Sequence, residues 1–477
     1  MFDRLILFFF YFFMLSKFFS ENVKILPKYI DLINFPLFAF LFTTLVVSFK
    51  KKSQQDGGET RFILYSFGIF SICTIISILF STSSILFPAS ILFYVGLIEG
   101  PVLYISLNKY VRKTEKMISN LNKYFIVLLI FNLAIVFLIN LPEFAITGNP
   151  DKISGAYGNN QNQFSTLLLI NGAYLLGYNF MKKSRTSVVI ITQLVIFIVF
   201  YLSQFRAATP FFLVSYFIII GILYGKRILY RLIPIATIGA ILIASILYLT
   251  ESDERVKGLR YEEWGDLISH PLDFLYLGKF QIYGSVIDMY KDYPETILTG
   301  AGPGNFLSRA NFTFNYEINV KGKGVGEIIK DIFDIKYSYY SDLHYKYVKN
   351  RIAQEIIFGT YQLSNPATSY LSALSEIGII GGMTIITLYI FLIIKSIKFF
   401  RIIREKNPQY IPLAIALVGI TTYVFQLAFL EYYWEMARVT LPVWLLFWAV
   451  KTIAYSKSEE EQEDANNVSQ NNNLLNQ

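Results

Sequence analysis

The sequence predicts an all-α polytopic membrane protein with about 12 transmembrane helices. Of the 477 residues, 54% are hydrophobic and only 16% are charged, whereas soluble proteins have about a quarter of their residues charged. The mean hydropathy is +0.46. Apolar residues form long runs, and basic residues lie in short clusters between those runs. The net charge of +8 therefore indicates membrane topology rather than binding to nucleic acid.

Each apolar run predicts one helix, because backbone groups in lipid must form their hydrogen bonds within the membrane-spanning structure itself. The predicted spans lie near 5–15, 30–49, 62–80, 85–107, 124–141, 164–181, 188–202, 210–224, 232–249, 377–394, 410–429 and 437–454. No small-residue cleavage site follows the first run. We therefore interpret it as a retained span rather than a signal peptide.

The distribution of lysine and arginine predicts the orientation of the spans. With both termini in the cytoplasm, every even-numbered connection is cytoplasmic and basic, as the positive-inside rule requires. These basic connections cover 50–61, 109–123, 182–185, 226–231 and 395–406. Short connections on the other side contain far fewer basic residues.

Four segments follow from this topology. Spans 1 to 9 occupy 1–250, and spans 10 to 12 occupy 367–456. Between them, 251–366 forms a large extracytoplasmic loop between spans 9 and 10 that is rich in Tyr, Lys and Asp. The acidic and then Asn-rich tail, 457–477, is expected to be disordered and cytoplasmic.

Several common site chemistries are excluded. One cysteine, Cys73, and two histidines, His270 and His344, supply neither a disulfide framework nor a metal centre. The sequence contains no Walker, G-x-S-x-G or H-E-x-x-H motif, and no D-x-D pair for a metal-dependent nucleotide-sugar site. We therefore expect no metal and no cofactor.

Arg206 is the first candidate site residue. It lies in YLSQFRAATPFFLVSYF, at the predicted outer junction of spans 7 and 8. From its position alone, a snorkelling arginine at a helix end is the simpler interpretation. However, Ser203, Gln204 and Thr209 form a polar kink and Pro210 opens a helix, so free N–H groups and a guanidinium can meet at an anion.

An amide-rich segment precedes the sixth span. Asn159, Asn160, Gln161, Asn162 and Gln163 supply both donors and acceptors, which suit sugar hydroxyls. The alternative is a polar loop that caps the following helix.

A glycine-rich segment, TILTGAGPGNFLSRANF, lies in the predicted outer loop. Gly300, Gly302 and Gly304 permit a tight turn and a close approach of backbone. The segment does not follow a strand of a βαβ unit, so a dinucleotide site is excluded. Among the basic residues of the same loop, Lys279 and Arg309 can bind phosphate, although most such charges are simply solvated.

The segment SNPATSYLSALSEIGIIGG leads into span 10. Tyr370 lies on one face of the expected helix, and Glu376 lies near the outer interface. Glu376 is a candidate proton acceptor, and a capping or interface residue is the alternative. Gly378, Gly381 and Gly382 allow close helix packing.

Taken in order, four patterns resemble those of the O-antigen polymerase and O-antigen ligase family, a group of bacterial membrane enzymes. The family patterns G-x-x-x-N-x-N, S-x-x-R, G-x-G-x-G-x-F and H-N-x-Y-L…E-x-G-x-x-G resemble 158–162, 203–206, 300–306 and 367–381. Ala367 and Thr368 stand where the family has His and Asn, which favours a polymerase over a ligase.

The resemblance implies that oligosaccharide repeat units linked to polyprenyl pyrophosphate are polymerised, without a metal, at the periplasmic face of the bacterial inner membrane. Arg206 and Glu376 would be catalytic. The implied substrate-binding residues are Asn159, Asn162, Ser203, Lys279, Gly300, Gly302, Gly304, Arg309 and Tyr370. Partners would be the lipid-linked glycan, the bilayer, a chain-length regulator and a flippase, with no nucleic acid.

Four alternatives stay open. Two are enzymes, an O-antigen ligase that transfers glycan to a lipid acceptor and a peptidoglycan-type polymerase. The third is a passive scaffold. The fourth is a flippase or transporter for lipid-linked oligosaccharide, which would place charged residues at mid-membrane. Only Glu99 and Asp31 are notable charges inside the spans, and the long loop 251–366 is not needed for transport.

Overall fold

The computed structural model describes the greater part of the chain. The described residues are 2–23, 25–26, 34–47, 57–81, 85, 87–111, 114–147, 152–157, 160–203, 208–225, 281–311, 341–349 and 368–475. Within them every regular element is helical and no strand occurs, which confirms the predicted all-α class for this part of the chain. The predicted ninth span, 232–249, lies outside the described residues.

The other predicted spans each overlap a helix. These helices are α1 (Phe2–Lys17), α2 (Asn34–Val47), α3 (Gly58–Leu79), α4 (Phe87–Tyr110), α5 (Thr114–Ile135), α7 (Gln161–Met181), α8 (Thr186–Leu202), α9 (Thr209–Tyr224), α18 (Ser369–Lys406), α19 (Ile411–Leu427) and α20 (Ala437–Leu475). Of the helices in the described residues, 6 are long and apolar enough to cross a membrane. They are Gly58–Leu79, Phe87–Tyr110, Lys116–Thr147, Ser369–Lys406, Pro408–Leu427 and Ala437–Ser456. The chain thus has the character of a helical membrane protein.

Shorter elements connect these helices. They are η1 (Phe18–Asn22), η3 (Val136–Asn140), α6 (Leu141–Thr147), η5 (Gly155–Tyr157), α12 (Gln281–Asp292), α13 (Thr296–Thr299), α16 (Asp342–His344), η10 (Tyr345–Lys349), η12 (Pro408–Tyr410) and η13 (Tyr433–Glu435). Helix α20 continues through 457–475, where the sequence predicted a disordered tail. This segment begins with good helix formers and extends a helix that is already nucleated, so its addition to the helix costs little free energy.

Three helices form the interior of the bundle. The most apolar windows of α20, α19 and α4 are 89%, 83% and 78% buried, whereas that of α3 is only 28% buried. Helix α19 packs against α7, α18 and α9, and α20 packs against α4. On the outer helices, Ile72, Leu79, Ile380 and Ile394 are more than half exposed, as expected for side chains that face lipid.

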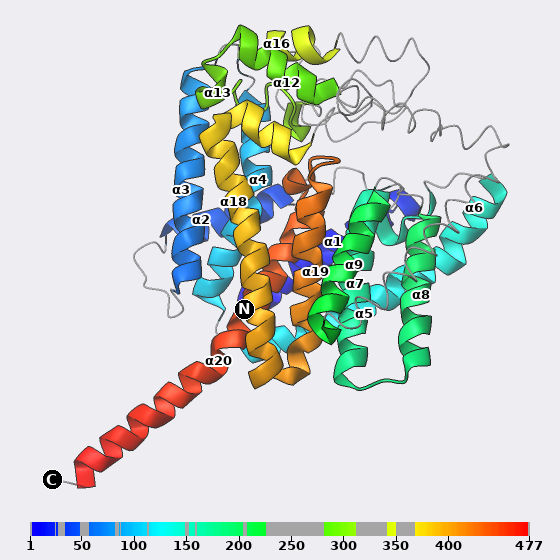
Figure 1. Cartoon of the computed structure of the whole chain (residues 1–477), viewed down its shortest axis with the longest axis vertical. Coiled ribbons are helices and arrows are strands. Elements are labelled where there is room, and N and C mark those ends of the chain that lie inside the picture. Colours follow the sequence, from blue (N-terminus) through cyan, green and yellow to red (C-terminus); the bar gives the residue numbers. More distant parts are fainter. Residues whose placement is uncertain are drawn as a thin grey trace.

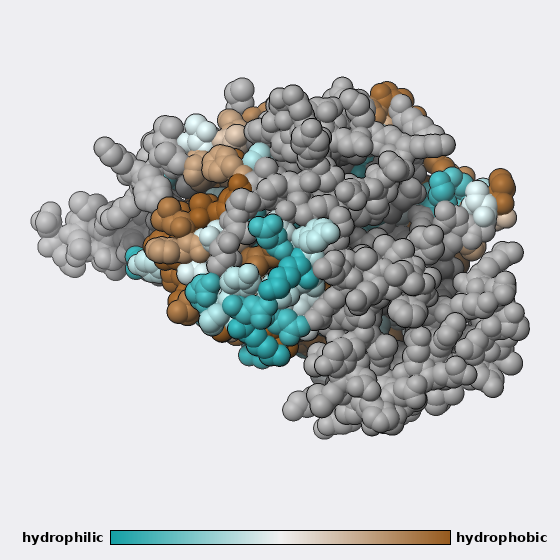
Figure 2. Space-filling model, turned by 90° about the horizontal axis from the view of Figure 1, so that it is seen from above, coloured by the Kyte–Doolittle hydropathy of each residue, from teal (hydrophilic) through white to brown (hydrophobic). Residues whose placement is uncertain are grey.

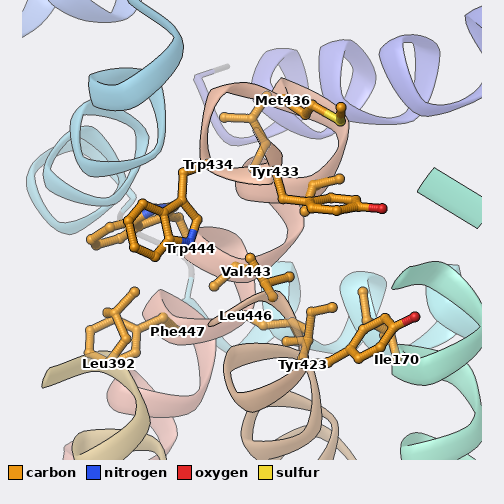
Figure 3. Packing of buried hydrophobic residues seen from close by; sticks show 14 of the residues in the cluster. Ile170, Leu392, Tyr423, Tyr433, Trp434, Met436, Val443, Trp444, Leu446 and Phe447 are labelled. Carbon is orange, nitrogen blue, oxygen red and sulfur yellow. The ribbon is translucent and has the colours of Figure 1, made fainter. Parts of the chain in front are cut away.

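Aromatic side chains fill the centre of this packing, and Figure 3 shows Trp434, Trp444 and Tyr433 among them. Trp444 lies against α4 at Gly100, where a Cβ atom would be 2.0 Å from its ring. The Tyr104 ring is 6.0 Å from Trp444. A glycine therefore lets α4 and α20 approach closely enough to enclose a large ring.

The two ends of the bundle differ. Figure 1 shows α12, α13 and α16 above one end, and the α7–α8 and α18–α19 connections at the other end. The second end contains Lys182, Lys183, Arg185, Arg404 and Lys406. Seen from above in Figure 2, hydrophilic side chains gather in a patch beside a hydrophobic flank. We call the segment 251–366 the insertion, and its described residues are 281–311 and 341–349. The described insertion and these basic connections thus lie at opposite ends.

Candidate functional site

A glycine-rich loop, defined here as residues 300–311, covers the upper end of α3, α4 and α18. Gly300, Gly302 and Gly304 have φ values of 78°, 100° and 79°. A Cβ atom on Gly300 would lie 2.4 Å from the Glu376 backbone, and one on Gly304 would lie 2.5 Å from the Ala89 backbone. The predicted tight turn and close backbone approach are confirmed, because only glycine satisfies both requirements.

Helix α18 is kinked where this loop meets it. Gly378 has φ 73° and ψ 170°, and a Cβ atom there would lie 2.0 Å from the Leu298 carbonyl oxygen. The Ala301 N–H donates to the Ser375 carbonyl at 2.7 Å, and the Gly302 N–H donates to the Glu376 carbonyl at 3.1 Å. The kink thus exposes carbonyls that pair with the loop backbone.

The carboxylate of Glu376 holds the loop from below. Its Oε2 accepts from the Gly304 N–H at 2.6 Å. Its Oε1 accepts from the N–H groups of Phe306 at 2.9 Å, Leu307 at 2.6 Å and Ser308 at 2.6 Å. The side chain is fully buried. Of the two roles expected for Glu376, this geometry favours the structural one, because four donors already surround its oxygens.

Serine hydroxyls fasten the same region to α3 and α4. Ser77 donates to the Glu376 carbonyl at 2.6 Å, Ser81 to the Ala301 carbonyl at 2.9 Å, and Ser90 to the Pro303 carbonyl at 2.7 Å. The loop is therefore fixed to three helices rather than to one.

A second buried carboxylate, Glu435 in η13, holds the far end of the loop. Its Oε2 accepts from the Arg309 N–H at 2.9 Å, and its Oε1 accepts from the Ser372 hydroxyl at 2.8 Å. The Arg309 guanidinium donates to the Glu435 carbonyl at 3.3 Å and is itself exposed. Burial is the largest cause that raises the pKa of Glu435 to about 8, and the nearby Glu376 is the second cause. The carboxyl of Glu435 is therefore mainly protonated at neutral pH.

The far part of the insertion supports the loop from above. The Nδ1 of His344 lies 2.7 Å from the Phe306 carbonyl, so it carries the hydrogen, because a carbonyl can only accept. Ser341 donates to the Asn305 carbonyl. His344 is 3% exposed. The two separated parts of the insertion therefore form one cover over the bundle end.

The structure brings together five of the predicted site residues: Gly300, Gly302, Gly304, Arg309 and Glu376. Tyr370 lies apart, because its hydroxyl donates to the Phe425 carbonyl at 2.8 Å and its ring packs on Phe429 and Trp434.

The remaining predicted site residues do not join this group. Ser203 ends α8 and donates to the Phe200 carbonyl at 2.7 Å. Asn162 lies in α7, and its side chain is outside the described part of the chain. Arg206, Asn159 and Lys279 also lie outside the described residues.

Glu435, Ser372 and His344 were not predicted to be site residues from the sequence. One signal for Glu435 was available, since EYYWEMAR places acidic residues in the short outer connection between the last two predicted spans. Ser372 and His344 carry no comparable local signal.

The chemical capacity of this site includes the guanidinium of Arg309 and the carboxyl of Glu435. Exposed Arg309 can stabilise a departing oxyanion, and Glu435 can exchange a proton near neutral pH. In the described residues, no three His, Cys, Asp or Glu side chains form a group that could hold a metal ion. No protein-family model matches the chain, and no curated protein matches its sequence.

Proposed function

We propose that this protein is a membrane glycan polymerase of the O-antigen polymerase type. It would join oligosaccharides carried on polyprenyl pyrophosphate at the outer face of the bacterial plasma membrane. The observation that carries the proposal is the rigid attachment of the glycine-rich loop, with Arg309 at its end, to the membrane helices through Glu376 and Glu435.

The reaction needs few groups. An acceptor hydroxyl attacks the anomeric carbon of the donor sugar, and the bond from that carbon to the diphosphate oxygen breaks. The diphosphate leaves with the electron pair, and positive charge stabilises it. Arg309 is the described cation suited to this task, and Arg206 and Lys279 are the further candidates from the sequence.

The proton of the acceptor hydroxyl must also be removed. Glu376 is a positioning residue in this proposal, because backbone donors surround its carboxylate. Each Glu435 oxygen accepts one described hydrogen bond, so this carboxylate in its ionised form is the better proton acceptor.

Polymerase is preferred over ligase because of two positions in the sequence. The position of the family histidine is Ala367. Thr368, at the position of the family asparagine, caps α18 by accepting from the Leu371 N–H at 3.1 Å.

The experiment is complementation of a deletion strain, with the length of the surface polysaccharide and the membrane level of each variant as readouts. Arg309→Ala and Arg206→Ala should each leave single-repeat product at normal protein level. Lys291→Ala is the matched control, because this insertion lysine is exposed and its described salt bridge, to Asp288 at 3.5 Å, lies outside the loop contacts of Glu376 and Glu435.

Other outcomes would point elsewhere. Free lipid-linked polymer in the deletion strain would identify a ligase, and oligosaccharide accumulated in the cytoplasm would identify a flippase. Full-length polysaccharide in both arginine variants would show that neither Arg309 nor Arg206 is needed for the reaction.

A further inference from the structure

A second arginine, Arg438, is buried in the first turn of α20 and is 5% exposed. Its Nη2 donates to the Ser16 hydroxyl at 2.7 Å, and its Nε donates to the Phe13 carbonyl at 3.3 Å. The guanidinium carbon lies 4.4 Å from the centre of the Phe13 ring. Helix α1 thus fixes this cation in place at the end of the bundle where α20 begins. A charged side chain at such a place invites a functional interpretation, because its desolvation is costly.

The short element η5 lies against the same helix α1. Two buried asparagines fix its backbone, since Asn140 accepts from the Gly155 N–H at 2.9 Å and Asn132 accepts from the Ala156 N–H at 2.9 Å. Gly155 has φ 58°, and a Cβ atom there would lie 2.5 Å from the Asn132 amide oxygen. The position of η5 is therefore defined by its neighbours.

Two hydroxyls of this segment are buried without a hydrogen-bond partner. They are the Tyr157 hydroxyl and the Ser154 hydroxyl, and the two residues are 1% and 0% exposed. Burial raises the pKa of Tyr157, and the nearby charge of Arg438 partly offsets this effect. Folded proteins pair most of their buried hydroxyls, and a bound group is one way in which the remaining ones are satisfied.

We propose that Arg438 and Tyr157 form a binding site for the phosphate or diphosphate headgroup of a lipid. A guanidinium with hydroxyl donors is the combination that recognises phosphate oxygens. Arg438 lies in the first turn of the candidate membrane span Ala437–Ser456, near the depth of lipid headgroups, so a headgroup resident in the membrane suits the site better than a soluble anion. The diphosphate form of the ligand rests on the proposed function, whereas a phospholipid headgroup does not.

The test measures the thermal stabilisation of the full-length protein in detergent by geranylgeranyl diphosphate and, separately, by phosphatidylglycerol. Tyr157→Phe removes only a hydroxyl that lacks a partner, so its melting temperature without ligand should equal or exceed that of the parent protein. Its affinity should fall roughly five- to tenfold, as expected for one lost hydrogen bond.

Tyr216→Phe is the matched control. The Tyr216 hydroxyl is also buried without a partner, but it lies against Gly172 of α7 and outside the proposed site. This variant should bind like the parent protein. Arg438→Gln should lose about a hundredfold in affinity, and Arg438→Lys should lose less, because it keeps the charge.

The outcomes separate the two proposals. Stabilisation by the prenyl diphosphate alone supports both this site and the polymerase. Stabilisation by phosphatidylglycerol that Tyr157→Phe weakens supports the site independently of the polymerase. Parent-like binding by Tyr157→Phe and Arg438→Gln, stabilisation by neither lipid, or a lower melting temperature for Tyr157→Phe would overturn the site.

Discussion

Two buried carboxyl groups at one end of the bundle perform different tasks. Glu376 accepts four backbone N–H groups of the loop, so it supplies the acceptors for a chain segment that otherwise would leave those donors unpaired. Glu435 accepts one backbone N–H and one hydroxyl, and it lies beside the charge of Glu376. The first residue positions the loop, and the second has fewer described hydrogen bonds.

Replacing Glu376 by Gln tests the positioning role. The amide NH₂ would face a backbone N–H donor where the carboxylate accepts, so we expect a loss of about 3 kcal/mol in the free energy of unfolding. Glu295→Gln is the control, because Glu295 is exposed at the start of α13, and it should change stability by less than about 0.5 kcal/mol. Chemical denaturation in detergent measures the free energy of unfolding of both variants. Equal stability of the two variants would contradict the positioning role of Glu376.

The raised pKa of Glu435 predicts a pH dependence of stability. Its pKa rises from the ordinary value of 4.5 to about 8 in the folded protein, so the folded state holds one more proton between these two values. The stabilising contribution of the neutral form is therefore complete below pH 4.5, is lost as the pH rises to about 8, and is absent above it.

The measurement is thermal unfolding of the parent protein and of Glu435→Gln between pH 5 and pH 9. The amide does not titrate, so the variant should lack a slope of up to about 1.4 kcal/mol per pH unit that the parent protein shows. Parallel curves for the two proteins would show that Glu435 does not titrate in this range.

At the scale of elements, backbone contact between the loop and the kink of α18 decides the geometry of the site. Gly300 and Gly378 lie against each other's segments, and neither position has room for a side chain. Both also have φ values that other residues adopt only with strain. The contact therefore requires glycine on each side.

Gly304→Ala tests this close approach. The new methyl group would meet the Ala89 backbone at 2.5 Å with φ at 79°, and we expect at least about 2 kcal/mol of destabilisation. Gly68→Ala is the matched control in α3, where no atom lies within 4 Å of the added carbon. That variant should be neutral, or more stable by up to about 1 kcal/mol. A similar melting temperature for both variants would contradict the packing argument.

The sequence predicted the helices better than it predicted the site. Apolar runs located α3, α4 and α19 within a few residues, because burial in lipid or in the bundle imposes an apolar run on each span. The π-helical turns η1 and η3 carry no such signature, and they were not predicted.

Partners across the chain are harder to predict. Arg309 and Glu435 are 126 residues apart in the sequence, and Glu376 is 68 to 72 residues from its loop partners. Such pairs depend on how helices pack, which local periodicity does not encode. Glycine spacing was informative because it reports backbone shape directly.

At the scale of the whole molecule, burial and charge vary along different directions. Burial increases from α3 toward α19 and α20, so the sides of the bundle present apolar side chains. Charge varies from end to end, with the described insertion at one end and basic connections at the other, as Figure 1 shows. A bilayer that contacts the sides would place the two ends in different compartments.

Cysteine labelling tests this orientation. Cys73 is the single cysteine, so Cys73→Ser provides a background in which only an introduced thiol reacts. Tyr345→Cys marks the insertion, where Tyr345 is 51% exposed, and Lys183→Cys marks the turn between α7 and α8. In intact spheroplasts a membrane-impermeant maleimide should label the first position and not the second. Arg206→Cys should react from the same side as Tyr345→Cys, because the proposed cations must share one compartment.

Permeabilised membranes provide the control for this comparison. Both Tyr345→Cys and Lys183→Cys should then be labelled, which would show that protection at Lys183 reflects the membrane rather than burial. Equal labelling of the two positions in intact spheroplasts would place both ends in one compartment. The polymerase proposal would then fail, because its lipid-linked donor and its loop could not meet at the outer face. Labelling of Arg206→Cys only after permeabilisation would remove that residue from the site and leave Arg309 as the described cation there.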